Sequence, residues 1–152
     1  MSEAATGGAV NFRLLGASDI PSVHALWAAS GLPFHPEGRD APALMGAEIE
    51  AGSAFLIGAF DGDALVGVVL GTDDGRKGWV NRLAVRPDRR GEGLGGRLIE
   101  RCETVFAERG RGIVACLIED WNDASLALFQ KSGYALRRDI LYLRKMPRGE
   151  GW

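Results

Sequence analysis

The sequence predicts a mixed α/β fold, in which a central mixed sheet of about six to seven strands is flanked by about four helices. Two observations carry this prediction. Short apolar runs joined by turn signals occupy much of the first half, which is typical of antiparallel strands. The second half alternates strand, helix and strand, which is typical of a parallel β-α-β crossover. Because the 152 residues contain no repeat and no linker, we expect one domain over 10–146, between a flexible lead-in at 1–9 and a tail at 147–152.

The first two elements are a strand and a helix. The run "VNFRLL" predicts a short strand over 10–15. Ile20, Val23 and Trp27 recur at helical spacing, so they predict a helix over 18–30 with one apolar face.

A second helix and three strands follow. The helix, over 41–51, carries a weaker apolar stripe and ends before a glycine. The apolar runs 54–60 and 64–71 surround the turn sequence "DGD", which predicts a β-hairpin. After another glycine-containing turn, "WVNRLAV" predicts a strand over 79–85.

The last third of the chain predicts two helices and two strands. An apolar stripe predicts a helix to about residue 108; its members are Leu94, Leu98, Cys102, Val105 and Phe106. The run "IVACLI" (113–118) is apolar throughout, as a strand buried on both faces should be. Asn122 is suited to cap a helix that Gly133 ends, and "DILYLRKM" predicts a final strand over 139–146.

One loop combines bare backbone with concentrated positive charge. The segment "RPDRRGEGLGGRL" (86–98) holds four arginines and four glycines between a strand and a helix. Its glycines allow close approach to the backbone, and the helix N-terminus offers unpaired N–H groups and positive potential. Such a site suits a phosphate or pyrophosphate, to which Arg89 and Arg90 can add charge-assisted hydrogen bonds. A solvated glycine-rich turn is the alternative that the glycines alone leave open.

A dinucleotide-binding fingerprint is the competing interpretation of this loop. Residues 91–96, "GEGLGG", satisfy the pattern G-x-G-x-x-G. That fingerprint requires its first glycine directly after the strand, whereas five residues separate Val85 from Gly91. The remaining chain is also too short for the second half of a doubly wound sheet, so we reject this interpretation.

Two segments resemble the GNAT superfamily of N-acetyltransferases. The family's acetyl-CoA-binding pattern, Arg or Gln followed by two residues, Gly, one residue and Gly or Ala, falls on Arg90, Gly93 and Gly95. A second segment, "NDASLALFQKSGY" (122–134), resembles a later motif of the family. Since the other elements match in order from about residue 10 to 146, the resemblance implies a GNAT-like sheet with a β-α-β core that binds coenzyme A (CoA).

The resemblance implies acetyl-CoA as cosubstrate and no metal. Loop amides would hold the pyrophosphate, and the pantetheine arm would lie where the preceding strand splays from the next parallel strand. A backbone N–H near Leu83 or Ala84 would stabilise the oxyanion. The cofactor-binding residues expected in this way are Leu83, Ala84, Val85, Arg90, Gly91, Glu92, Gly93, Leu94, Gly95, Gly96, Asn122, Ser125 and Phe129.

The implied reaction is direct attack of an amine on the thioester. Many members of the family carry a tyrosine as proton donor to the leaving thiolate, but this chain has Phe129 there. Water, Ser125 or Tyr134 would then supply the proton, or none is needed. Glu119, which follows a buried strand, and His35, in the loop between the first two helices, are candidates for the base; each is also an ordinary loop residue.

Composition restricts the partners. The net charge of −2 and the lack of a strong basic surface argue against nucleic acid, and no run approaches the ~20 apolar residues of a membrane span. Cys102 and Cys116 lack metal-ligand spacing and are interpreted as reduced core residues of a cytoplasmic protein.

The acceptor and the assembly carry weaker signals. We expect the acceptor to be a small-molecule or peptide amine, including a lysine, and the tail with Trp152 offers a contact for a homodimer. A CoA-binding sensor or scaffold that has lost catalysis is the alternative function, favoured by Phe129 alone.

Overall fold

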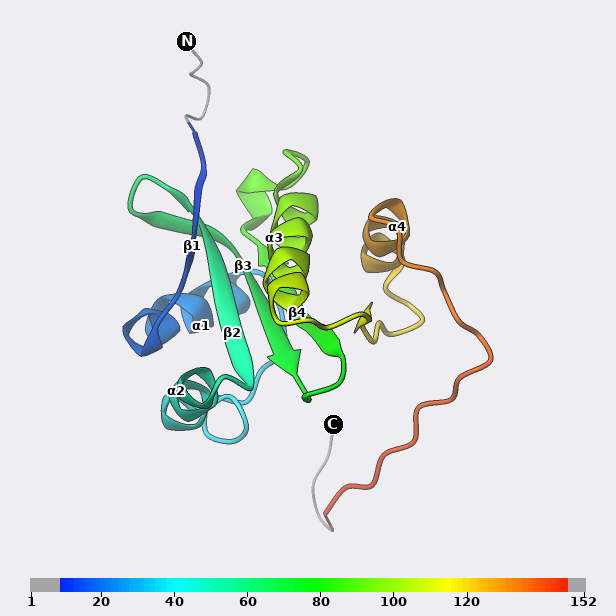
Figure 1. The fold of residues 1–152 in the computed structure, drawn as a ribbon. Helices are drawn as coiled ribbons and strands as arrows, with labels where there is room; N and C mark the ends of the chain where they lie inside the picture. The colour runs from blue at the N-terminus through cyan, green and yellow to red at the C-terminus, as the bar shows by residue number, and fades with distance from the viewer. Residues whose placement is uncertain (1–8, 148–152) are drawn as a thin grey trace.

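The computed structural model describes residues 9–147 and contains a five-stranded mixed sheet in the order β1-β2-β3-β4-β5 (Figure 1). The first four strands are antiparallel, and β5 is parallel to β4. The strands are β1 (Asn11–Leu14), β2 (Ala54–Asp61), β3 (Ala64–Asp73), β4 (Gly78–Val85) and β5 (Val114–Ala115). The helices are α1 (Ile20–Ala29), α2 (Pro42–Ala51), α3 (Leu94–Glu108) and α4 (Asp123–Lys131), with 3-10 turns η1 (Ala17–Asp19) and η2 (Pro87–Arg89).

The lead-in up to residue 8 and the tail from residue 148, with Trp152, lie outside the described residues. Within residues 9–147, no helix is long and apolar enough to cross a membrane.

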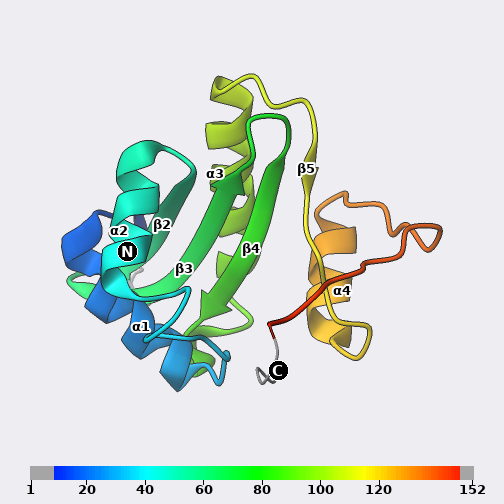
Figure 2. The same cartoon turned by 90° about the horizontal axis from the view of Figure 1, so that it is seen from below.

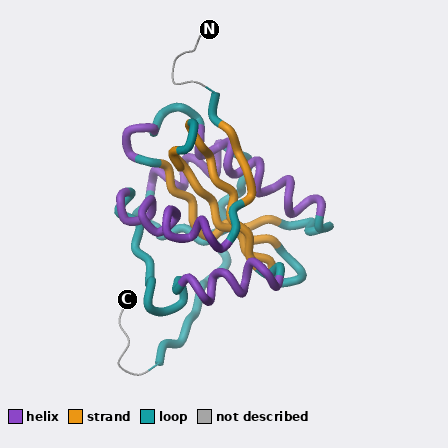
Figure 3. Tube along the Cα trace, turned by 90° about the vertical axis from the view of Figure 1, so that its left-hand side faces the viewer, coloured by secondary structure: helices purple, strands orange, loops and turns teal. Residues whose placement is uncertain are grey.

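The sheet separates two apolar layers, and Figure 3 shows the strands at the centre with helices around them. On one face, α1 and α2 cover a core that includes Trp27, Met45 and Ala84. On the other face, α3 buries the apolar stripe predicted from the sequence, ending in Phe106, which is fully buried. Burial of these stripes is the main favourable contribution to the stability of the fold.

A β-bulge in β4 decides which side chains face which layer. Leu70 pairs with Arg82 and Gly71 pairs with Val80, so Asn81 is the extra residue. Val80 packs in the α3 layer, whereas Ala84 packs in the α1–α2 layer. Side chains of an unbroken strand alternate with a period of two, so these two would share a face without the bulge.

Two predicted strands are wrong in whole or in part. The run 113–118 pairs with β4 only at Val114 and Ala115, and Ile113 and Leu117 are exposed rather than buried. Residues 139–146 form no strand: they belong to the extended segment after α4, which lies apart from the sheet (Figure 1). A strand exists only where a partner strand supplies its hydrogen bonds, and neither segment has that partner over its full length.

A buried carboxylate ties the end of α3 to the sheet. Asp73 accepts hydrogen bonds from Arg111 Nε at 2.7 Å, Arg109 Nη1 at 3.0 Å and the Gly75 backbone N–H at 2.8 Å. Arg109 also donates to the carbonyl of Gly52 at 2.7 Å. The hydrogen bond from Arg111, together with those from Gly75 and Arg109, lowers the pKa of Asp73 to about 2.

Asp73→Asn should lower the free energy of unfolding at pH 7 by about 2 kcal/mol, because both arginines lose a charged acceptor. The pKa of Asp73 is about 2 in the folded chain and about 3.9 when unfolded. Its charge therefore stabilises the fold above the unfolded pKa, and the effect is lost as the pH falls through the folded pKa. Urea titrations at pH 7 and pH 3 should show the difference between variant and wild type shrinking at pH 3. A pH-independent difference would contradict this assignment.

Candidate functional site

The glycine-rich loop leads from the end of β4 into the N-terminus of α3. Gly91 and Gly93 both have φ +82°, a left-handed conformation that favours glycine, and Gly93 is the residue directly before the helix. A Cβ atom placed on Gly91, Gly93 or Gly96 would meet no heavy atom within 4 Å. The glycines therefore leave open space in front of the loop backbone.

That open space faces unpaired backbone donors. The first N–H groups of any helix have no intrahelical acceptor, and in α3 these include Leu94, Gly95 and Gly96. The regular ladder begins where the Arg97 N–H donates to the Gly93 carbonyl at 3.2 Å. The 15-residue helix adds positive potential at the same end. The loop therefore presents open space, unpaired N–H donors and positive potential together, a combination that suits a phosphate.

Gly95 has a second role that the sequence does not reveal. A Cβ atom at this position would lie 3.0 Å from Leu128 Cδ2 of α4 and 3.7 Å from Leu83 Cδ2 of β4. The missing side chain thus lets α4 approach the beginning of α3. This contact connects the two sequence motifs, which are about 30 residues apart in the chain.

The strands β4 and β5 diverge beside this loop, as expected from the resemblance. Their pairing is limited to Gly78 with Val114 and Trp79 with Ala115, after which the two chain segments separate (Figure 2). The remainder of β4, which includes Leu83, Ala84 and Val85, pairs only with β3. One edge of this stretch is therefore left without a partner strand among the described residues.

The two adjacent arginines of the loop differ in their contacts. Arg90 is exposed, and its Nε donates to the Val85 carbonyl at 3.3 Å. The side chain of Arg89 is only 12% exposed, and it pairs with the carboxylates of Asp61 and Glu92. Arg89 thus contacts carboxylates rather than presenting a free guanidinium to phosphate oxygens.

The side of the site formed by α4 contains the second motif. Asn122 caps α4, as predicted: its side-chain oxygen accepts the Ser125 N–H at 3.2 Å. Phe129 is 6% exposed and packs edge-to-face on Tyr134, with ring centroids 5.1 Å apart. The Tyr134 hydroxyl donates to Glu103 Oε2 at 2.7 Å, and burial together with this hydrogen bond raises the pKa of Tyr134. Tyr134 therefore holds its proton firmly against Glu103.

The two candidate bases lie on separate loops. Glu119 is exposed after β5, and its carboxylate accepts a hydrogen bond from Trp121 Nε1 at 3.3 Å. The side chain of His35 is also exposed, in the loop between α1 and α2, while its backbone N–H donates to Asp40 Oδ2 at 2.8 Å. The structure shows no direct contact between these two candidates.

Sequence reasoning missed the buried ion pair that attaches the His35 loop to β4. Arg82 contacts Asp40 at 3.2 Å, donates to the Pro33 carbonyl at 2.7 Å and stacks over the Trp27 ring at 4.9 Å. Burial is the main cause that lowers the pKa of Arg82. An arginine within an otherwise apolar strand indicates that a carboxylate partner is nearby in the fold. The neighbouring sequence does not identify that partner, because Asp40 lies 42 residues upstream.

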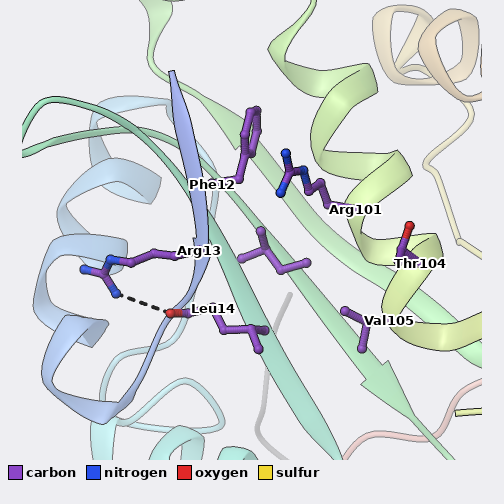
Figure 4. A pocket seen from close by; sticks show the side chains of 7 residues that line it. Phe12, Arg13, Leu14, Arg101, Thr104 and Val105 are labelled. Carbon is purple, nitrogen blue, oxygen red and sulfur yellow. Dashed lines mark hydrogen bonds between the residues drawn. The ribbon is translucent and has the colours of Figure 1, made fainter. Parts of the chain in front are cut away.

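A groove of about 410 Å³ lies elsewhere, between β1 and α3 (Figure 4). It is lined by Phe12, Arg13, Leu14, Ile57, Arg101, Thr104 and Val105. None of these is a predicted site residue, and β1 is at the opposite edge of the sheet from β5. The groove therefore does not belong to the site at the glycine-rich loop.

Part of this chain is similar in sequence to known acetyltransferases. The profile of the acetyltransferase (GNAT) family matches residues 21–134. The acetyltransferase SG1711 of Sodalis glossinidius is 33% identical over 91 residues, which are 60% of this chain. The match spans about 63% of the length of that relative.

Solved structures share the fold. An aminoglycoside N-acetyltransferase, AAC(6')-Iy in complex with CoA, superposes with a TM-score of 0.77 at 18% identity, over 93% of this chain and 98% of that one. A ribosomal-protein-alanine N-acetyltransferase from Brucella melitensis gives a TM-score of 0.70 at 22% identity, over 91% of this chain and 100% of its own. The family profile covers β4 and both motifs that follow it, and the chain therefore belongs to the acetyltransferase (GNAT) family.

Proposed function

We propose that this chain is an N-acetyltransferase that moves the acetyl group of acetyl-CoA to a primary amine by direct attack of the amine on the thioester. The observation that carries the proposal is the position of the glycine-rich helix N-terminus beside the unpaired edge of β4. The helix N-terminus suits the anionic pyrophosphate of CoA, and the unpaired strand edge suits its extended pantetheine arm. The CoA complex of a structural neighbour supports the same cosubstrate.

Each part of the site has a proposed role. The loop amides from Gly91 to Gly96, with Arg90 and the backbone of Glu92, would bind the pyrophosphate. The backbone of Leu83 and Val85 would pair with the pantetheine arm, and an N–H at Leu83 or Ala84 would stabilise the oxyanion. Asn122, Ser125 and Phe129 would line the other side of the arm.

Proton transfer is proposed to involve exposed groups. Glu119 and His35 are the candidate bases for the incoming ammonium. Tyr134 is a candidate acid, but it would have to exchange its hydrogen bond with Glu103 for one to the thiolate. A free thiol has a pKa of about 8.5, so its thiolate can also leave near neutral pH without a dedicated acid.

The acceptor is proposed to be a small-molecule or peptide amine. Structural neighbours include an aminoglycoside N-acetyltransferase and a ribosomal-protein-alanine N-acetyltransferase, so both acceptor classes occur on this fold. The test is thiol release from acetyl-CoA in the presence of tobramycin, an alanyl peptide and a lysine peptide with a blocked N-terminus. CoA should also raise the melting temperature while NAD should not, because a ligand that binds only the folded state stabilises it. Stabilisation by NAD alone would contradict the proposal.

A CoA-binding sensor or scaffold without catalysis is the second candidate function. Phe129, at the position where a tyrosine is often the acid, is the observation that favours it. This candidate predicts stabilisation by CoA without turnover of any amine in the panel.

Phe129→Tyr should change turnover by less than about tenfold, or ~1.4 kcal/mol of barrier, if the thiolate leaves unaided or a water protonates it. The Phe129 ring is buried against Tyr134, so the variant tests whether one hydroxyl there matters. Steady-state thiol release measures the effect. A gain of a hundredfold or more from an almost silent wild type would instead support the sensor or scaffold.

We also propose a homodimer, supported by an apolar patch in the extended segment after α4. Four successive residues, Ile140, Leu141, Tyr142 and Leu143, are 65%, 82%, 66% and 84% exposed. Contiguous apolar surface of this kind is typical of an interaction site. Light scattering after size exclusion should find a dimer in the wild type and a monomer in the double variant Leu141→Asp, Leu143→Asp. A monomeric wild type would contradict this proposal.

A reducing, cytoplasmic location is proposed as well. Cys102 and Cys116 are both free thiols. Burial raises the pKa of Cys102 to about 12 and that of Cys116 to about 11, so both stay protonated. Unpaired buried cysteines are typical of proteins in a reducing compartment.

A further inference from the structure

Arg89 joins the glycine-rich loop to a distant hairpin through two carboxylates. Its Nη1 lies 2.7 Å from Asp61 Oδ2, and its Nε lies 3.0 Å from Glu92 Oε2. A third hydrogen bond runs from Nη2 to Glu92 Oε1 at 3.0 Å. All three nitrogens of the guanidinium therefore have a carboxylate partner, and the geometry toward Glu92 is bidentate.

The three residues differ in how firmly the backbone holds them. Asp61 ends β2 and belongs to the tight hairpin with β3. Glu92 lies between Gly91 and Gly93, the two loop residues with φ +82°. Glycine backbones are the least restricted, so this is the part of the loop that most needs an external support. Arg89 supplies a connection from the hairpin to that part.

The exposure of Arg89 excludes a simple role as a phosphate ligand. Its side chain is 12% exposed, against 39% for Asp61 and 44% for Glu92. The guanidinium is therefore the least exposed of the three groups and is already occupied by both carboxylates. The two hydrogen-bonded carboxylates raise the pKa of Arg89.

We infer that Asp61, Arg89 and Glu92 form a positioning network that holds the loop amides in the geometry needed to bind the pyrophosphate of CoA. Asp61 is no part of the loop motif, since it lies 28 residues before Arg89. The inference rests on the proposed function. It places Asp61 and Arg89 outside contact with the ligand.

The network makes a prediction that is opposite to simple electrostatics. Asp61→Asn removes a negative charge near an anionic ligand, so charge alone predicts tighter CoA binding. Loss of the network instead predicts weaker binding. We expect the dissociation constant for CoA to rise about five- to tenfold, measured by isothermal titration calorimetry at low ionic strength.

Asp63→Asn is the matched control. Asp63 belongs to the same hairpin turn, and its substitution removes the same charge as Asp61→Asn does. Among the residues that the structure describes, Asp63 forms no ion pair, whereas Asp61 pairs with Arg89. Its CoA affinity should stay within about twofold of wild type. Asp61→Glu keeps the carboxylate and should bind CoA more tightly than Asp61→Asn does. That result would show that the ion pair matters, rather than the backbone conformation that aspartate favours at this position.

Two further measurements separate positioning from direct contact. Arg89→Met should weaken CoA binding, but Arg90→Met should reduce the salt dependence of the affinity more than Arg89→Met does. An exposed guanidinium in contact with a phosphate contributes more to that dependence than one already paired with two carboxylates. Hydrogen exchange of the ligand-free protein should be faster at the amides of residues 91–96 in Asp61→Asn than in Asp63→Asn. Equal melting temperatures would show that the variants remain folded.

The possible failures are distinguishable. If the wild type does not bind CoA at all, the proposed function is wrong, and the cofactor role of the network is wrong with it. If the wild type binds CoA but Asp61→Asn binds it equally well or more tightly, the network inference alone is wrong. A reduction of the salt dependence in Arg89→Met as large as that in Arg90→Met would also overturn it, because Arg89 would then act as a phosphate contact.

Discussion

Gly93→Val is expected to raise the Michaelis constant for acetyl-CoA by about a hundredfold or more while leaving the chain folded. Two effects combine at this position. The backbone has φ +82°, which a β-branched side chain resists at a cost of about 1–2 kcal/mol. The new side chain would also project into the open space in front of the loop amides, where the pyrophosphate is proposed to lie.

The control for this variant is Gly110→Val. Gly110 follows α3 with φ +78° and also has open space around the position of a Cβ atom. Both variants therefore pay the backbone strain, but only Gly93 lies in the proposed site. We expect similar losses of stability and a large difference in CoA affinity, measured by calorimetry and by steady-state kinetics. Wild-type affinity in a folded Gly93→Val variant would mean that the pyrophosphate binds elsewhere.

The features that local sequence determines were predicted well. The apolar stripe of α3 has helical spacing, and Leu98, Cys102 and Phe106 are buried in the structure, while Val105 is half-buried. Asn122 caps α4 through a hydrogen bond to a residue three positions away. The glycine-rich loop is also local, because its φ angles and the helix N-terminus are decided within a few residues. Each of these predictions needed no knowledge of a distant partner.

The features that depend on distant partners were not predicted. The run 113–118 and the segment 139–146 have the composition of strands, but composition does not supply a neighbouring strand. The ion pair of Arg82 with Asp40 is equally non-local. The bulge at Asn81, which sends Arg82 to the α1–α2 face, leaves no mark in the alternation of "WVNRLAV". Arg89 was interpreted as a phosphate contact because its partner Asp61 is 28 residues away.

Gly78 lies where β4 and β5 still pair. The Phe106 ring occupies the space that a side chain at this position would need. A Cβ atom on Gly78 would lie within 2.6 Å of three ring carbons of Phe106. The ring cannot move aside easily, since it is fully buried and packs edge-to-face on Phe55 with centroids 5.1 Å apart. The backbone cannot move easily either, because the Gly78 N–H donates to the Ile113 carbonyl at 2.9 Å.

Gly78→Ala should therefore lower the free energy of unfolding by about 3 kcal/mol, the upper range for overpacking of a core. Gly112→Ala is the control, because a Cβ atom there meets nothing within 4 Å and its φ is not left-handed. Urea denaturation should show the loss for Gly78→Ala and little change for Gly112→Ala. The double variant Gly78→Ala, Phe106→Leu should lose less than the two single changes added together, since the smaller side chain makes room for the methyl group. A loss below about 0.5 kcal/mol for Gly78→Ala would show that α3 can shift on the sheet, and the beginning of the β4–β5 divergence would then not be fixed by this contact.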